Sequence, residues 1–232
     1  MTEEIDAVMF DLGGTLIDFV PSKNVVFHKA LADNGFNVDL KDVTRVVASA
    51  ERKFDEESAN LDGLHEDAFW DRFDKYVLDK LSYKGDQNKF AKYVSKEFDK
   101  IVPKTESWVE YPDARPLLDK LKQRGFALGI ISNATELARR VLDNLDLTRY
   151  FDAIIISDEV GVRKPDERIF LLAAKKAESL PNRVLFVGDK LAVDVLGAKR
   201  AGMNAMLIDR AGIYSDVDCL RVRSLDDLSK YL

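Results

Sequence analysis

Short runs of apolar residues recur along the chain, and they constrain its fold more than any other feature of the sequence. Each run spans four residues, is rich in apolar side chains such as Val and Ile, and is bounded by residues such as Gly, Asp, Ser or Asn. Continuous runs of this kind are typical of strands that are buried on both faces, as in a parallel sheet. The runs occupy residues 7–10, 128–131, 153–156, 184–187 and 205–208.

Stretches with helical character separate the last four runs, at residues 135–144, 166–177 and 193–201. A regular alternation of strand and helix implies right-handed crossover connections between parallel strands. The sequence therefore predicts an α/β fold with a doubly wound parallel sheet.

The segment from residue 19 to residue 107 has a different pattern. It contains no strand-like run, is dense in Lys, Asp and Glu, and places apolar residues at helical spacing over 69–81 and 90–98. Such spacing indicates an all-helical insertion of about four helices, with the aromatic stripes as its own core. We therefore expect two domains, one formed by residues 1–18 and 108–232 and the other by residues 19–107.

The composition favours a folded, cytoplasmic protein. Of the 232 residues, 46% are hydrophobic, 33% are charged and one is a cysteine, Cys219. A lone cysteine excludes an intrachain disulfide and suits a reducing compartment. The N-terminus is acidic, unlike a signal peptide, and no window approaches the roughly 18 apolar residues of a membrane helix. The net charge of −6 and the lack of a basic block argue against a nucleic-acid partner. The sequence sets no oligomeric state.

Most of the predicted strands end in a cluster of polar residues, and ligands of open α/β sheets bind at the carboxyl ends of strands. After the first run, Asp11 is followed by Gly13 and Gly14, whose exposed backbone N–H groups suit an anion beside a carboxylate. After the fourth run, Asp189 and Asp194 match a site for a hard cation, because Mg²⁺ prefers one or two protein carboxylates.

The second and third runs are followed by side chains that could bind a phosphate. Ser132, at the second strand tip, carries a hydroxyl that can donate to a phosphate oxygen, and Asn133 comes next. After the third run, Lys164 precedes Pro165 at the entry to a helix. Its ammonium group could hold the Asp11 carboxylate ionised and neutralise charge on a transferring group.

Each cluster taken alone also has a structural explanation. Asp11 could cap a glycine-rich turn, and Thr135 could cap the following helix. Lys164 could be a solvated surface lysine, and Asp194 could favour a helix start through the helix dipole. Four clusters in this order on successive strands instead favour one site that binds Mg²⁺ and a phosphate-like anion.

The four clusters resemble the four motifs of the haloacid dehalogenase superfamily across the whole chain, with the insertion where that family has a helical (type 1) cap. The resemblance implies a Rossmann-like core and a mobile cap. The matching segments are Asp11-x-x-Gly14-Thr15-Leu16, Ser132-Asn133, Gly161-x-x-Lys164-Pro165-Asp166 and Gly188-Asp189-x4-Asp194-x2-Gly197-Ala198-x2-Ala201-Gly202-Met203.

The resemblance also implies catalytic roles. Asp11 would be the nucleophile that forms an aspartyl-phosphate, and Lys164 the balancing cation. Thr15 and Ser132 would bind the transferring group, with Gly14 and Asn133 as further substrate contacts.

The metal site follows from the same resemblance. Asp11, Asp189 and the backbone carbonyl of Gly13 would hold Mg²⁺, and Asp194 would bind it directly or support the residues that do.

One position departs from the family pattern. Its phosphatases carry Asp-x-Asp, and the second Asp is a general acid and base, whereas this chain has Gly13 there. General acid–base catalysis contributes roughly 10²–10⁴-fold. The leaving group would then need little protonation, as in an acyl or aryl phosphate, or the acid would come from the cap. His28 could supply such a group, or it could be a packed or solvated helix residue.

Other readings remain open. A phosphonatase-like enzyme, which cleaves a C–P bond, would need a cap lysine able to form a Schiff base, and Lys23, Lys29, Lys41 and Lys53 are candidates. A 2-haloacid dehalogenase also lacks the second Asp, but such enzymes typically lose the carboxylate that Asp189 keeps. A catalytically impaired protein that binds phosphate and Mg²⁺ is a further alternative. We expect a Mg²⁺-dependent phosphatase that acts on a small phosphorylated substrate.

Overall fold

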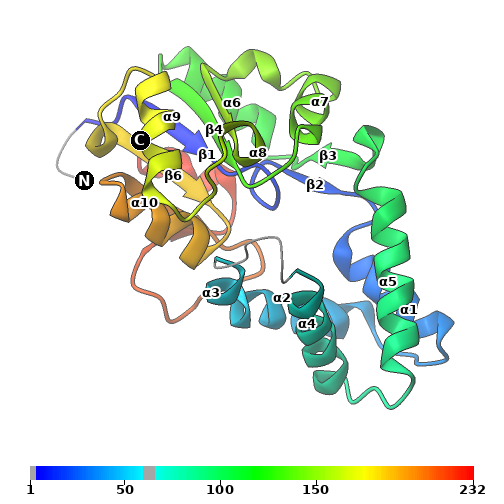
Figure 1. The fold of residues 1–232 in the computed structure, drawn as a ribbon. Helices are drawn as coiled ribbons and strands as arrows, with labels where there is room; N and C mark the ends of the chain where they lie inside the picture. Colours follow the sequence, from blue (N-terminus) through cyan, green and yellow to red (C-terminus); the bar gives the residue numbers. More distant parts are fainter. Residues whose placement is uncertain (1–3, 60–65) are drawn as a thin grey trace. The chain divides into compact units, whose positions relative to one another are not determined.

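The computed structural model describes residues 4–59 and 66–232, and it divides the chain into two compact units (Figure 1). The core unit comprises Met1–Asp18 and Trp108–Leu232, and the helical unit comprises Phe19–Ser107. Each unit has its own apolar core.

The core unit is built on a six-stranded sheet in the order β5-β4-β1-β6-β7-β8. All of its paired strands are parallel, and β1 lies between β4 and β6, with Phe10 opposite both Ile130 and Val187. The expected α/β fold with a doubly wound parallel sheet is confirmed. The strands are β1 (Ala7–Phe10), β4 (Ala127–Ser132), β5 (Ala153–Ile156), β6 (Val184–Gly188), β7 (Asn204–Ile208) and β8 (Leu220–Val222).

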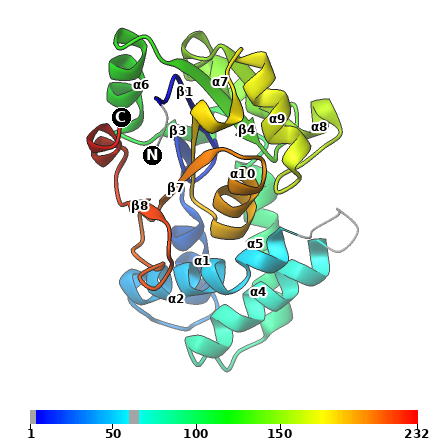
Figure 2. The same ribbon diagram turned by 90° about the vertical axis from the view of Figure 1, so that its left-hand side faces the viewer.

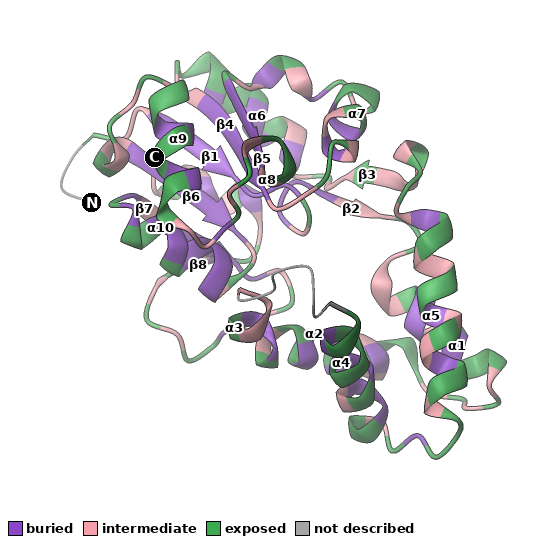
Figure 3. Cartoon of the chain, in the orientation of Figure 1, coloured by how far each residue is buried: buried purple, intermediate pink, exposed green. Residues whose placement is uncertain are grey.

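Helices cover both faces of this sheet. Alternate residues of β1 belong to two separate cores, Val8 and Phe10 to one, Ala7 and Met9 to the other. Helices α6 and α7 contribute to the first core, and α9 and α10 to the second. Strands β1, β5 and β6 are therefore buried along their whole length, and Figure 3 colours them accordingly. The helices are α6 (Ala114–Gln123), α7 (Leu137–Asn144), α8 (Ser157–Val160), α9 (Glu167–Lys176) and α10 (Leu196–Arg200).

Two elements of the core unit differ from the sequence expectation. The helix expected at 193–201 begins earlier, because a π-helical turn (Leu191–Val195) precedes α10. Strand β8, at the edge of the sheet beside β7 (Figure 2), is not predicted at all. It is three residues long and Leu220 is 40% exposed, so it lacks a continuous apolar run. Short 3₁₀ turns lie at Thr105–Ser107 in the helical unit and, in the core unit, at Thr148–Tyr150, Pro181–Arg183 and Leu225–Lys230.

The two chain connections between the units are paired as a small sheet. β2 (Ile17–Phe19) pairs with β3 (Trp108–Glu110), and the Val20 N–H donates to the carbonyl oxygen of Ser107 at 2.7 Å. The outgoing and returning segments are therefore held together at the point where the chain leaves the core unit.

The helical unit encloses a core rich in aromatic rings, as the helical spacing predicts. Phe27, Phe73 and Phe90 are buried together, and the ring centroids of Phe27 and Phe90 lie 5.4 Å apart. Trp70 was expected in the same stripe, but it is 45% exposed. The helices are α1 (Lys23–Asp33), α2 (Leu40–Lys53), α3 (Asp55–Ser58), α4 (Glu66–Lys80) and α5 (Gln87–Ile101).

One carboxylate of the helical unit is buried in an unfavourable setting. Asp74 on α4 is 8% exposed, and burial together with the nearby charge of Asp71 raises its pKa to about 7, although Lys23 acts in the opposite direction. The folded state therefore favours the neutral form of Asp74. The free energy of unfolding should fall as the pH rises from about 4 to about 7, because the unfolded chain releases this proton first.

We expect Asp74→Asn to stabilise the protein at pH 8, because Asn never ionises in this buried position. The gain should be roughly 1–4 kcal/mol at pH 8 and should shrink toward pH 5, since one pKa unit corresponds to about 1.4 kcal/mol. Thermal unfolding followed by circular dichroism across this pH range measures it. Asp79→Asn, an exposed change on the same helix, is the control. A gain that does not depend on pH would contradict the expectation.

Candidate active site

Asp11 lies at the carboxyl end of the central strand of the sheet. It follows β1 directly, and its N–H donates to the carbonyl oxygen of Val187 on β6 at 2.9 Å. Its residue is 8% exposed. One carboxylate oxygen, Oδ1, accepts a hydrogen bond from the Lys164 ammonium at 2.5 Å.

Lys164 is a buried cation held between two carboxylates. Its Nζ donates to Asp11 Oδ1 at 2.5 Å and to Asp194 Oδ1 at 2.7 Å, and the residue is 2% exposed. Burial alone would lower the pKa of this ammonium group, but the attraction of Asp11 and Asp194 raises it above its ordinary value. Lys164 therefore stays charged, and it is not a solvated surface lysine.

Asn133 fixes the backbone from which Lys164 projects. Its Nδ2 donates to the Lys164 carbonyl oxygen at 2.8 Å, and its Oδ1 accepts from the Lys164 N–H at 2.7 Å. This pair of bonds joins the end of β4 to the segment before α9. Asn133 was expected to contact substrate; what the structure adds is a positioning role, and the substrate contact stays a prediction.

Asp194 is tied into the site through both of its oxygens. Oδ1 accepts from Lys164, and Oδ2 accepts from the Lys190 N–H at 3.0 Å. The carboxylate also lies against Gly188, where an added Cβ would be 2.5 Å from Asp194 Cγ. A side chain at position 188 would thus displace Asp194.

Three carboxylates converge at this edge of the sheet. Asp11, Asp189 and Asp194 each offer an oxygen, and these oxygens lie within 4.8 Å of one another. Gly14 permits the arrangement, because its φ is +80° and a Cβ there would be 2.6 Å from Asp189 Oδ2. The pKa of Asp11 lies above its ordinary value, because burial, together with the nearby charge of Asp194, outweighs the opposite effect of Lys164. An all-oxygen donor set of this kind fits a hard divalent cation.

The remaining predicted residues lie in the same loops. Thr15 is fully buried, and its hydroxyl has no hydrogen-bond partner among the described residues. Ser132, 5% exposed, ends β4, next to β1. Gly13 lies in open space, since an added Cβ would meet no heavy atom within 4 Å. The side chains of Asp11, Lys164, Asp189 and Asp194 thus lie close together in one cluster. Thr15, Ser132 and Gly13 lie near this cluster because of where the backbone places them.

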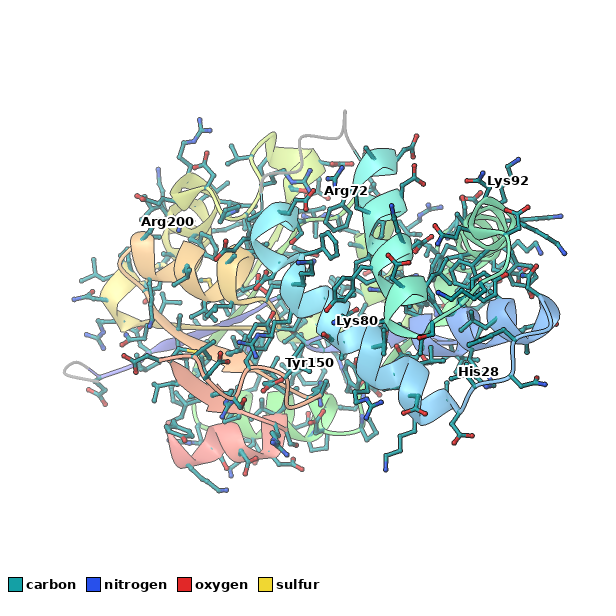
Figure 4. All side chains as sticks on the ribbon, turned by 90° about the horizontal axis from the view of Figure 1, so that it is seen from below. His28, Arg72, Lys80, Lys92, Tyr150 and Arg200 are labelled. Atoms are coloured by element: carbon teal, nitrogen blue, oxygen red, sulfur yellow. The ribbon has the colours of Figure 1, made fainter. Side chains whose placement is uncertain are left out.

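The helical unit carries the residues considered above as a general acid or base and as Schiff-base lysines, and several of them have partners within that unit. His28 (labelled in Figure 4) places Nε2 2.9 Å from the Val38 carbonyl oxygen. Lys23 pairs with Glu51 at 2.6 Å, and Lys53 lies 5.5 Å from the ring centroid of Tyr76. Lys29 and Lys41 are exposed.

Sequence reasoning missed a charged pair at a further strand end. Asp209 and Arg210 follow β7 at the same edge of the sheet, and Arg210 Nη2 donates to the Thr15 carbonyl oxygen at 2.8 Å. The signal was present, because the fifth apolar run ends in this pair just as the other runs end in theirs.

A family model of haloacid dehalogenase-like hydrolases matches residues 5–202. The phosphoglycolate phosphatase of Salmonella typhimurium is 30% identical over 86% of this chain and 79% of its own length. The (S)-2-haloacid dehalogenase 4A of Burkholderia cepacia is 29% identical over 91% of this chain and 86% of its own. The glyceraldehyde 3-phosphate phosphatase of Methanopyrus kandleri is 38% identical over 47% of this chain, and the chain spans only 46% of that relative.

Solved structures share the fold. A hydrolase of the same superfamily from Bacillus subtilis, crystallised with magnesium, superimposes with a TM-score of 0.65 at 18% identity, covering 99% of each chain. Among residues 4–59 and 66–232, no helix combines the length and the apolar content needed to cross a membrane.

We expect Gly14→Ala to weaken the binding of a divalent cation by roughly 10–100-fold, because the new Cβ would push Asp189 away from the cluster. Calorimetric titration with Mg²⁺ measures this. Gly125→Ala is the matched control: its φ of +83° imposes a similar backbone strain, but no heavy atom lies within 4 Å of an added Cβ. Equal affinities in the two variants would contradict the expectation.

Proposed function

We propose that this chain, which belongs to the haloacid dehalogenase-like hydrolase family, is a Mg²⁺-dependent phosphatase that acts on a small phosphorylated metabolite through an aspartyl-phosphate on Asp11. The observation that carries the proposal is the convergence of the Asp11, Asp189 and Asp194 carboxylates, two of which, Asp11 and Asp194, pair with a buried lysine. Relatives named as phosphatases of phosphoglycolate and of glyceraldehyde 3-phosphate support the substrate class.

Asp11 would act as the nucleophile. Its Oδ1 is occupied by Lys164, so the other carboxylate oxygen would attack phosphorus, and the bond from phosphorus to the leaving oxygen would break. Lys164 would favour the ionised form of Asp11 against the effect of burial, and it would offset charge on the transferring group. Water would then attack phosphorus of this acyl phosphate, the bond from phosphorus to the Asp11 oxygen would break, and inorganic phosphate would leave the restored carboxylate. Bound Mg²⁺, held by Asp11, Asp189 and the Gly13 carbonyl with Asp194 adjoining, would withdraw charge from the phosphoryl oxygens.

Two hydroxyl groups would hold the transferring phosphoryl group. The Thr15 hydroxyl is buried without a partner, so it has a free proton to donate to a phosphoryl oxygen. Ser132 would donate from the neighbouring strand. Gly14 and Asn133 stay proposed substrate contacts beside them.

Gly13 sets the choice of leaving group. With no carboxylate at this position, the loop of residues 11–15 carries no second acid that could protonate an alkoxide beside Asp11, and such a donor would have to come from the helical unit. Acyl and aryl phosphates, whose leaving groups need little protonation, should therefore be better substrates than alkyl phosphates.

Dehalogenation of a 2-haloacid is a second candidate, favoured by the dehalogenase relative that aligns with 91% of this chain. It would use Asp11 as nucleophile on carbon, without a metal. Chloride release from (S)-2-chloropropanoate in the presence of a chelator tests it. Release that needs no metal, together with no phosphatase activity, would favour this candidate over the phosphatase.

We expect the wild type to hydrolyse p-nitrophenyl phosphate in the presence of Mg²⁺ and to lose this activity in a chelator. Asp11→Asn should abolish turnover, because an amide oxygen is a poor nucleophile. Asp6→Asn is the matched control, since Asp6 precedes β1 at the other end of the strand and pairs with Arg183. Full activity of Asp11→Asn, or of the wild type without divalent metal, would reject the proposal.

We expect Gly13→Asp to raise kcat/KM on an alkyl phosphate by about tenfold or more, because a carboxylic acid at this position can protonate the leaving oxygen. The open space around Gly13 admits the new side chain. The gain on p-nitrophenyl phosphate should be smaller. Gly13→Asn, similar in size but unable to transfer a proton, is the control. An equal gain in both variants would contradict the explanation.

A further inference from the structure

Arg210 lies at the carboxyl end of β7 and contacts three residues from two separate segments of the core unit. Its Nη1 and Nη2 bind the two oxygens of Asp113 at 2.9 and 3.0 Å. Nη2 also donates to the Thr15 carbonyl oxygen at 2.8 Å. The guanidinium carbon lies 3.8 Å from the ring centroid of Tyr111, so the planar group stacks on that ring.

The contact with Thr15 meets a need of the nucleophile loop, residues 11–15. Thr15 is fully buried, and a buried carbonyl group requires a donor. Nearby carbonyl groups accept from backbone N–H groups of the same segment: the Leu12 carbonyl from Leu16 at 2.9 Å, and the Ile17 carbonyl from Gly14 at 2.8 Å. Among the described backbone hydrogen bonds none ends on the Thr15 carbonyl, and Arg210 supplies that donor.

Arg210 is itself held in a fixed position. Asp113 also accepts from Ser224 Oγ at 2.8 Å and from the Leu225 N–H at 2.9 Å. Burial acts to raise the pKa of Asp113, but the bonds from Arg210, Leu225 and Ser224 keep it below its ordinary value. The carboxylate that anchors Arg210 is therefore ionised and fixed by three groups.

The stacking partner is fixed as well. The Tyr111 N–H donates to the Leu16 carbonyl oxygen at 2.9 Å, and its hydroxyl group donates to Asp18 at 3.2 Å. Tyr111 thus joins the returning chain to the segment just after the nucleophile loop. Arg210 therefore supports the nucleophile loop directly at Thr15, and through Tyr111 it supports Leu16, the residue that follows the loop.

We propose that Arg210 is a positioning residue for the phosphatase reaction: its guanidinium holds the Thr15 carbonyl so that the Thr15 hydroxyl and the Asp11 carboxylate face the transferring phosphoryl group. The inference rests on the proposed function. Arg210 acts through Thr15 and has no contact of its own with the reacting atoms.

Lysine should not replace Arg210. An ammonium group keeps the charge that pairs with Asp113, but it lacks the planar fork that reaches two carboxylate oxygens and a carbonyl while stacking on a ring. A displacement of about 1 Å in a catalytic loop can cost about 100-fold in rate. Arg210→Lys should therefore lower kcat by about 10–100-fold and change KM for p-nitrophenyl phosphate by less than about threefold.

Arg115 provides a matched control. It makes the same kinds of contact: an ion pair with Glu110 at 3.0 Å, a bond to the Leu145 carbonyl oxygen at 2.7 Å, and a ring contact with Tyr150 at 5.9 Å. None of these partners belongs to the nucleophile loop. Arg115→Lys should lower the melting temperature as Arg210→Lys does, yet leave kcat within about twofold of the wild type.

The decisive experiment measures kcat and KM for p-nitrophenyl phosphate with Mg²⁺ for the wild type and both variants, with thermal melting to verify folding. Arg210→Ala is then assayed with millimolar guanidinium, which should restore at least part of kcat, whereas it should have no effect on Arg115→Ala. Equal kcat values for Arg210→Lys and Arg115→Lys, a loss carried by KM alone, or no rescue would overturn the inference. If Arg210→Lys does not fold, Asp113→Asn, which loosens the anchor of Arg210, must show the same selective loss of kcat.

Binding of inorganic phosphate in the presence of Mg²⁺, followed by thermal shift, separates this inference from the proposed function. A wild type that binds phosphate but hydrolyses no ester would reject the phosphatase. The Arg210 inference would still hold if Arg210→Lys bound orthovanadate, which mimics the transferring phosphoryl group in the transition state, at least about tenfold more weakly than Arg115→Lys. Equal vanadate binding by these two variants would reject it.

Discussion

The buried ion pair of Lys164 with Asp11 and Asp194 is the interaction on which the site depends. Removing one partner of a buried charge network leaves an uncompensated charge, which is strongly destabilising. The network also joins separate parts of the sheet: Asp11 follows β1, Asp194 lies in the π-helical turn after β6, and Asn133 ties the backbone of Lys164 to the end of β4. The geometry of Asp11, the proposed nucleophile, is therefore set by the same contacts that join the carboxyl ends of the strands.

The absence of side chains matters as much as their presence at this edge. Gly188 lets Asp194 approach the end of β6, and Gly14 does the same for Asp189. Gly13 differs from both, because the space around it is open and the backbone is not in the left-handed region. The first two glycines are required by close packing, whereas the third leaves room for a side chain that related phosphatases are expected to carry. Position 13 therefore lacks a carboxylic acid although the space around it would admit one.

The sequence predicted the sheet well because strands covered on both faces must be apolar throughout, which leaves a direct trace in residues 7–10 and 184–187. The polar residues that follow these strands pointed to Asp11 after β1 and to Asp189 and Asp194 after β6. Lys164 lies further along the chain, beyond β5 and α8. The sequence did not predict strand β8, because a short edge strand need not be apolar throughout. It also did not predict that the ring of Trp70 is exposed, because helical spacing alone does not determine which side chains of a stripe become buried. The hydrogen bonds from Asn133 and Arg210 to backbone carbonyls were also not predicted, since they join segments that only the folded chain brings together.

The sequence separation within the charge network has a consequence for biosynthesis. Lys164 lies 153 residues after Asp11 and 30 residues before Asp194. A nascent chain therefore carries Asp11 without its cation until β1, β4 and β5 have been translated, and without the complete network until β6 has followed. Loop closure over this distance makes the pairing of Asp11 with Lys164 a late folding event. Chains that end before Lys164 lack this ion pair, so assembly of the proposed site depends on folding of the parallel sheet.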